Sequence, residues 1–272
     1  MINYRHYPNI KQCWGIFGMT FLGMLLATEV NIFESFIGND ITRILFYLVG
    51  LGLPVFFAYK MRKDWSGCTK LEVRTPEVGV LWLIIVTALG FILAINIPFT
   101  ELIPVPDFLD RQSDIVVSDY GFTSLLTAVV IAPILEEVLF RGIMLDGLLK
   151  KYSPKKAILF SSFLFGLSHF NPSQFIFCFL SGILLGWAYY NTRNLIYPIV
   201  IHVINNSLSF LLFYLGFNNL EELFITTSNL LIAVVVGFVI LAGSIYLLNR
   251  IFITSGKPDY TDNMPIKEKV SV

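Results

Sequence analysis

The sequence predicts an all-α, polytopic membrane protein, a bundle of about eight transmembrane helices with both termini in the cytoplasm. Three observations predict this class: the composition, the long apolar runs and the placement of the basic residues. Hydrophobic residues make up 56% of the 272-residue chain and charged residues 14%, against roughly 25% charged residues in an ordinary globular domain. The mean hydropathy is +0.72. Because hydrocarbon offers no partner to an unpaired backbone amide, and the runs lack the alternation of a β-barrel, each run is expected to be helical.

Eight apolar segments approach the roughly 20 residues that a bilayer crossing needs. In chain order they are residues 13–34, 41–60, 78–99, 122–149, 157–170, 174–191, 195–216 and 229–250. The first follows Arg5 and Lys11 and resembles a signal peptide, but no A-x-A-like cleavage site follows it, so it is interpreted as a retained span. The fifth is short because Asn171-Pro172 ends it, since proline disfavours helix at the preceding residue.

Charge placement supports the count of eight. Sixteen of the nineteen basic residues fall before the first span, between every second pair of spans, or after the last one. The other side has only Arg43 and Arg111, together with the acidic residues Asp107, Asp110, Asp114, Asp119, Glu221 and Glu222. By the positive-inside rule both termini are cytoplasmic, and an odd number of spans would scramble the pattern.

Net charge and cysteine spacing exclude other classes. The formal net charge is zero, so no basic field indicates a nucleic-acid partner. Cys13, Cys68 and Cys178 are far apart, which indicates neither a disulfide framework nor a thiolate metal site. They are interpreted as small apolar fillers.

Polar residues inside the predicted spans are the functional signal, because an ionised side chain near the bilayer centre costs roughly 2.5 to 3.5 kcal/mol. They occur at 136–142 (EEVLFRG), 165–169 (FGLSH) and 202–206 (HVINN). Residues four apart share a helix face, so Glu137 is expected to pair with Arg141, Phe165 to lie beside His169, and His202 beside Asn206. Glu136 lies about 100° around the helix from Glu137, so it does not share the face of Glu137 and Arg141 and is free to face a cavity.

Depth along the predicted helices tests whether these residues can meet. At about 1.5 Å per residue from the cytoplasmic ends, Glu136 lies ~20 Å deep, His169 ~18 Å and Asn206 ~16 Å. His202 lies only ~10 Å deep by the same estimate, so its depth agrees less well with that of the other three residues. Asp146, near the inner end of the fourth span, is expected at the interface.

Two chemistries suit this set of side chains. Glu136 and a nearby imidazole can act as general base and then general acid on a bound water, while His202 and Asn206 donate hydrogen bonds to an oxyanion. Alternatively, Glu136, His169 and His202 supply the three ligands of a catalytic zinc site. The residues leave this choice open. No GxSxG motif is present, so serine catalysis through Ser168 is the weaker idea.

The set EExxxR at 136–141, FxxxH at 165–169 and HxxxN at 202–206 resembles the CPBP family, also called the Abi or CAAX-protease-like family of intramembrane endopeptidases. The resemblance covers about residues 120–216. It implies that Glu136 and His169 activate the hydrolytic water, that His202 and Asn206 bind the oxyanion, and that Glu137 and Arg141 support the site. Whether the enzyme is glutamate-type or uses a divalent metal such as zinc stays open.

This resemblance also implies a division of the chain and a function. Residues 1–119 form an N-terminal three-helix membrane region with an acidic extracytoplasmic loop, residues 120–216 the catalytic core, and residues 217–272 a last helix and cytoplasmic tail. The expected partners are a peptide or membrane-protein substrate and the bilayer, and family members serve CAAX-protein trimming, peptide maturation or bacteriocin self-immunity. The alternatives are a non-catalytic membrane partner of a sensor kinase, transporter or toxin, and a proton-coupled transporter, against which the lack of visible inverted repeats counts.

Overall fold

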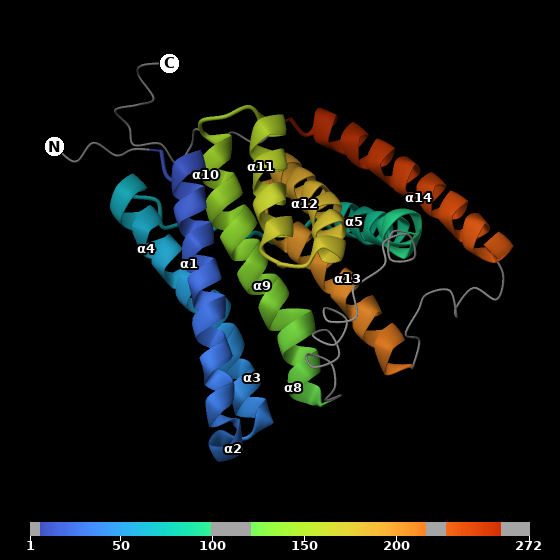
Figure 1. Ribbon diagram of the computed structural model, residues 1–272. Coiled ribbons are helices and arrows are strands. Elements are labelled where there is room, and N and C mark those ends of the chain that lie inside the picture. The colour runs from blue at the N-terminus through green and yellow to red at the C-terminus, as the bar shows by residue number, and fades with distance from the viewer. Residues whose placement is uncertain (1–5, 99–120, 216–226, 257–272) are drawn as a thin grey trace, which may run out of the picture.

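The computed structural model describes residues 6–98, 121–215 and 227–256, and all regular structure in these ranges is helical (Figure 1). Eight helical rods follow one another. The first four rods are α1 (Ile10–Thr28) with α2 (Glu34–Ile37), α3 (Asn39–Tyr47) with α4 (Leu53–Ser66), α5 (Val78–Phe91), and the run of α8 (Phe122–Leu125), α9 (Ala132–Glu137) and α10 (Asp146–Leu149). The last four are α11 (Pro154–Leu167), α12 (Pro172–Thr192), α13 (Ile196–Tyr214) and α14 (Thr227–Thr254).

Several rods contain wide or tight turns where the α-helical hydrogen-bond ladder changes. A 3₁₀ turn, Glu29–Phe33, joins α1 to α2. π-Helical turns join α3 to α4 (Leu48–Gly52) and extend α5 (Ile92–Asn96). Two more, Leu126–Ile131 and Val138–Leu145, flank α9. Each π turn inserts an extra residue into the helix, so it changes the faces of the residues that follow.

The rods agree with the eight predicted segments, and the protein is a multi-pass membrane protein. Among the described residues, six helices are long and apolar enough to cross a bilayer: Ile10–Ile37, Asn39–Ser66, Val78–Asn96, Phe122–Leu149, Gln174–Thr192 and Ser228–Thr254. α13 contains a shorter apolar stretch, Ile196–Leu212. α11 has 14 residues, or about 21 Å of helix, which is less than the roughly 30 Å of a hydrocarbon core. The count of eight crossings therefore stays a prediction.

Local signals explain where helices begin and end. Asn9 caps α1 through a capping box with Gln12. Pro154 stands in the first turn of α11, and Pro172 opens α12 immediately after Asn171. The expected stop at Asn171-Pro172 is confirmed, although α11 ends at Leu167 and His169 lies in the turn that follows. The predicted acidic extracytoplasmic loop lies outside the described residues, and the domain boundaries at 119/120 and 216/217 stay predictions.

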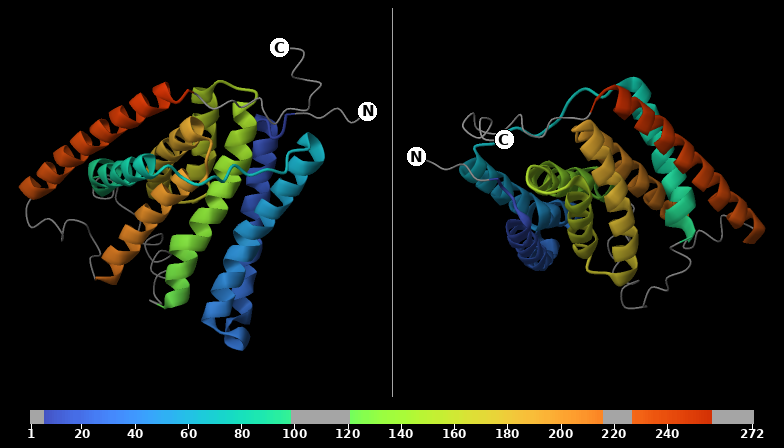
Figure 2. Two further views of the ribbon diagram at one scale, coloured as in Figure 1. Left: turned by 180° about the vertical axis from the view of Figure 1, so that it is seen from behind. Right: turned by 90° about the horizontal axis from the view of Figure 1, so that it is seen from above.

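The helices form a bundle in which α9 is central (Figures 1 and 2). α1 and the α3–α4 rod lie on one side of it, and α5 and α14 lie on the other side with α12 and α13 between. α5 and α14 touch backbone to backbone at two glycines. A Cβ added at Gly90 would lie 2.7 Å from the amide nitrogen of Leu241, and one at Gly237 would lie 2.6 Å from that of Ala94. Only glycine permits this approach.

A buried charge network joins α4 to α10. Arg62, 1% exposed, donates to the carboxylate of Asp146 at 2.7 Å and to the Gly142 carbonyl. Lys150 and Tyr189 also donate to Asp146. The side chain of Asp146 is 0% exposed, because Arg62 reaches it from another helix and supplies the opposite charge. Sequence position alone does not show that contact. The expected position of Asp146 at the membrane interface stays a prediction.

Asp146→Ala is expected to lower the free energy of unfolding by about 3–5 kcal/mol, because it leaves the Arg62 guanidinium buried beside no carboxylate. The measurement is thermal or denaturant unfolding in detergent. Asp64→Ala is the matched control, since Asp64 is exposed on α4 and such a change costs roughly 0.5 kcal/mol or less. Equal stability of the two variants would contradict a structural role for the network.

Candidate active site

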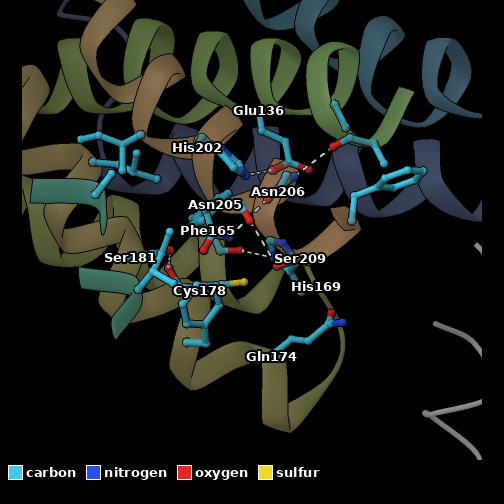
Figure 3. Close-up of a pocket in the computed structure, with 18 of the residues that line it drawn as sticks. Glu136, Phe165, His169, Gln174, Cys178, Ser181, His202, Asn205, Asn206 and Ser209 are labelled. Atoms are coloured by element: carbon cyan, nitrogen blue, oxygen red, sulfur yellow. Dashed lines mark hydrogen bonds and ion pairs between the residues drawn. The ribbon is translucent and has the colours of Figure 1, made fainter. Parts of the chain in front are cut away.

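A cavity of about 530 Å³ lies among the helices, and all four predicted catalytic residues line it (Figure 3). Glu136 comes from α9, His169 from the turn after α11, and His202 and Asn206 from α13. The other lining residues include polar and apolar side chains from α3, α5, α12 and α13, among them Tyr47, Phe91, Gln174, Phe177, Cys178, Ser181, Leu185, Asn205 and Ser209. The side chains from the three motifs thus meet, while their catalytic roles stay predictions.

Glu137 and Arg141 form the buried pair that their spacing indicates. Their atoms Oε1 and Nη1 are 2.7 Å apart, and the side chains are 0% and 1% exposed. Arg141 also donates from Nη2 to the Gly182 carbonyl on α12 at 3.2 Å. Its guanidinium lies 4.4 Å from the centre of the Phe165 ring, within cation–π range. Arg141 therefore ties three helices together.

Glu137 has a second partner that the sequence did not indicate. Nδ1 of His202 lies 2.8 Å from Oε1 of Glu137. A carboxylate paired with Arg141 only accepts hydrogen bonds, so Nδ1 of His202 donates and carries the proton. Nε2 of His202 then points toward Glu136, 3.7 Å from Oε2. His202 thus lies between the two adjacent carboxylates.

His202 was expected at a shallower depth than Glu136, and the structure corrects this. The two residues line one cavity. The sequence estimate assumes that both helices begin at the same depth, whereas Nε2 of His202 lies 3.7 Å from Oε2 of Glu136. No sequence signal gives the relative height of two helices.

His169 is held by the residue one turn before it. Nδ1 of His169 donates to the Phe165 carbonyl at 2.9 Å, because a carbonyl can only accept. Nε2 is left with a lone pair for a ligand. The Phe165 ring meets the His169 ring edge-on at 5.1 Å and the His202 ring at 5.6 Å. Phe165, 1% exposed, therefore positions both imidazoles.

Asn206 is anchored on two sides. Its Nδ2 donates to the Ala128 carbonyl at 2.9 Å, and its Oδ1 accepts from Nδ2 of Asn205 at 3.3 Å. Asn205 in turn accepts from Asn96 of the α5 rod at 2.9 Å. The sequence analysis missed Asn96, because nothing in the sequence distinguishes a polar residue near the end of an apolar run.

The zinc alternative needs Glu136, His169 and His202 around one ion. Within the described part of the chain, no three His, Cys, Asp or Glu side chains are grouped so that they could hold a metal. Nδ1 of each histidine contacts protein, so each imidazole could offer only Nε2 to an ion. Because the side chains are not grouped around one point, the donor set as placed does not fit a three-ligand site.

Fold and site together define a helical, multi-pass membrane protein with a cavity between its helices that polar and apolar side chains line. Comparison with known proteins identifies the family of one part of the chain. Residues 119–208 match the family described as Type II CAAX prenyl endopeptidase Rce1-like, and all seven residues of the three motifs lie inside that match. These residues form an Rce1-like domain of the CPBP family, so the predicted family is confirmed.

A relative from Escherichia coli, described as an uncharacterized 24.3 kDa protein, is 28% identical over 166 residues. The alignment covers 59% of this chain and 73% of that protein. No solved structure matches the chain significantly.

Glu137→Ala is expected to lower the free energy of unfolding by about 3–5 kcal/mol, because it leaves Arg141 buried without its carboxylate. Glu136→Ala is the matched control, since Glu136 is adjacent in sequence but faces the cavity with its side chain 16% exposed. We expect it to cost roughly 1 kcal/mol or less. Unfolding in detergent measures both, and the reverse order would contradict these assignments.

Proposed function

We propose that the protein is an intramembrane endopeptidase that hydrolyses a peptide bond in a membrane-associated peptide or protein. One observation carries the proposal: a carboxylate, two imidazoles and a carboxamide from three separate motifs line the same cavity. Its volume of about 530 Å³ lies within the roughly 300–1,000 Å³ of ligand sites. The Rce1-like domain supports protease activity.

Water activation falls to Glu136 and His169. Glu136 accepts a proton from the attacking water, and the lone pair on Nε2 of His169 accepts the other water hydrogen as a hydrogen bond and orients it. The water oxygen adds to the scissile carbonyl carbon. A tetrahedral intermediate with one negatively charged oxygen results.

Oxyanion binding falls to Asn206 and His202. One N–H of the Asn206 amide is used by Ala128, which leaves the second for the oxyanion. Nε2 of His202 lies 3.7 Å from Glu136, so it can receive the proton that Glu136 took from water. The resulting Nε2–H then donates a hydrogen bond to the oxyanion. When the intermediate collapses, the proton returns through Glu136 to the leaving nitrogen, the C–N bond breaks, and a carboxylic acid and an amine are released.

We also propose that both termini face the cytoplasm. The beginning of α1, the connection between α10 and α11 and the end of α14 lie at the same end of the bundle (Figure 1). Lys150, Lys151, Lys155 and Lys156 belong to that connection and its flanks. Basic residues concentrate on the cytoplasmic side of membrane proteins, and this end carries them.

Glu136→Gln and His169→Ala are each expected to lower kcat at least about 100-fold, the lower range for loss of a general acid–base group. Peptide profiling of membranes with and without the protein supplies candidate substrates, and cleavage by purified protein in detergent or liposomes is the assay. Unfolding temperature and chromatographic profile control for folding. Wild-type cleavage by purified Glu136→Gln would remove this mechanism.

Complementation separates the proposal from the other two functions. If the Glu136→Ala protein fully restores the wild-type phenotype in a deletion strain, the protein acts as a non-catalytic partner. If reconstituted protein moves protons with a solute in a flux assay and Glu136→Ala abolishes that flux, it is a transporter. We expect neither result.

Chelation tests the role of a metal. Because the described donors form no three-ligand group, we expect cleavage by purified protein to survive prolonged treatment with a strong zinc chelator. The control is a zinc protease of known dependence treated in the same detergent. Loss of activity that added zinc restores, with a stoichiometric metal content, would establish the zinc alternative instead.

A further inference from the structure

Three asparagine side chains form a hydrogen-bonded row that ends at the proposed oxyanion donor. Nδ2 of Asn96 donates to Oδ1 of Asn205 at 2.9 Å, Nδ2 of Asn205 donates to Oδ1 of Asn206 at 3.3 Å, and Nδ2 of Asn206 donates to the Ala128 carbonyl at 2.9 Å. Every amide donates in the same direction along the row. We refer to Asn96, Asn205 and Asn206 as the asparagine row.

The row begins outside the cavity and outside the family domain. Asn96 ends the π turn that follows α5, is 9% exposed, and is not among the residues that line the cavity. Asn205 and Asn206 both line it (Figure 3). The family match begins at residue 119, so a helix beyond the match contacts the active-site helix through this hydrogen bond.

Two contacts fix which way the Asn206 amide faces. A carboxamide has an acceptor on one arm and two donors on the other, and the two arms have nearly the same shape. Asn205 supplies a donor to the oxygen arm, and Ala128 supplies an acceptor to the nitrogen arm. A reversed amide would place oxygen against the Ala128 carbonyl and would turn an acceptor, instead of an N–H, toward a developing oxyanion.

The common direction of the bonds strengthens the last donor. Hydrogen bonds in a row polarise one another, by ~10–30% per bond in a condensed phase. Donation from Asn96 to Asn205, and from Asn205 to Asn206, therefore makes the remaining N–H of Asn206 a better donor. The row contains no ionisable group, so its effect does not depend on a change of protonation.

We propose that Asn205 and Asn96 are positioning residues that hold the Asn206 amide with its free N–H toward the substrate oxyanion. This inference rests on the proposed function. The oxyanion forms only as the transition state is approached, so the row affects kcat more than KM. The negative charge is stabilised by an amide whose orientation is set before substrate arrives.

The expected losses follow the position in the row. Asn206→Ala removes an oxyanion donor and lowers kcat roughly 10²- to 10³-fold. Asn205→Ala removes one neutral hydrogen bond to Asn206 and lowers kcat roughly 5- to 10-fold. Asn96→Leu, one step further away, lowers kcat about 2- to 5-fold, with KM unchanged because Asn96 does not line the cavity.

The deciding experiment is a set of double variants. Asn205→Ala or Asn96→Leu, added to Asn206→Ala, is expected to produce no further loss of kcat, because no amide remains to be oriented. A residue that acts through general stability would instead multiply its loss onto that of Asn206→Ala. Asn191→Ala is the matched control, since the Asn191 amide donates to the Trp187 carbonyl at 2.8 Å within α12 and lies outside the cavity; its kcat should equal wild type.

The outcomes separate this inference from the proposed function. A fully active Glu136→Gln protein would overturn both. Two outcomes would overturn the positioning role alone, each with Asn206→Ala protein inactive. In the first, Asn205→Ala and Asn96→Leu proteins are fully active. In the second, their losses of kcat multiply with that of Asn206→Ala in the double variants. Unfolding temperatures of the Asn205→Ala and Asn96→Leu proteins establish that they are folded. Either variant is enough for the comparison with its double variant.

Discussion

The buried carboxylate of Glu137 is the constraint on which the rest of the site depends. It has no exposed surface and accepts hydrogen bonds from Arg141 on its own rod and from His202 on α13. An uncompensated charge in this position would cost several kcal/mol, so α13 is held in the one rotation that presents His202 to Glu137. Glu136, one residue earlier and about 100° around the helix, then faces the cavity beside Nε2 of His202.

Phe165 transmits this constraint to the third motif. Its ring lies against the Arg141 guanidinium and meets the rings of His169 and His202 edge-on. Its carbonyl also accepts the Nδ1–H of His169. The phenylalanine of the FxxxH motif is therefore a support for two imidazoles. The three motifs therefore contact one another through Glu137, Phe165 and His202.

The sequence predicted the elements well and the relations between helices poorly. The apolar run 122–149 is the observed rod Phe122–Leu149, and the Glu137–Arg141 pair follows from its spacing of four. Both depend on local chain geometry. The depth of His202, the burial of Asp146 and the contact of Asn96 with Asn205 depend instead on the relative height and rotation of separate helices. The relative placement of helices is set by side-chain packing between rods that are far apart in sequence. The spacing of apolar residues within one helix carries no information about that packing.

The Rce1-like domain and the rest of the chain contribute different parts of the cavity. Glu136, His169, His202 and Asn206 all lie within residues 119–208. Tyr47 from α3 and Ala88, Phe91 and Ile92 from the α5 rod complete the wall from outside that range. The groups suited to hydrolysis thus come from the Rce1-like domain, whereas part of the surface that a substrate would touch comes from the N-terminal rods. Because apolar contacts discriminate between ligands by shape, two chains with the same polar groups in this domain could still differ in the molecules that their cavities accept.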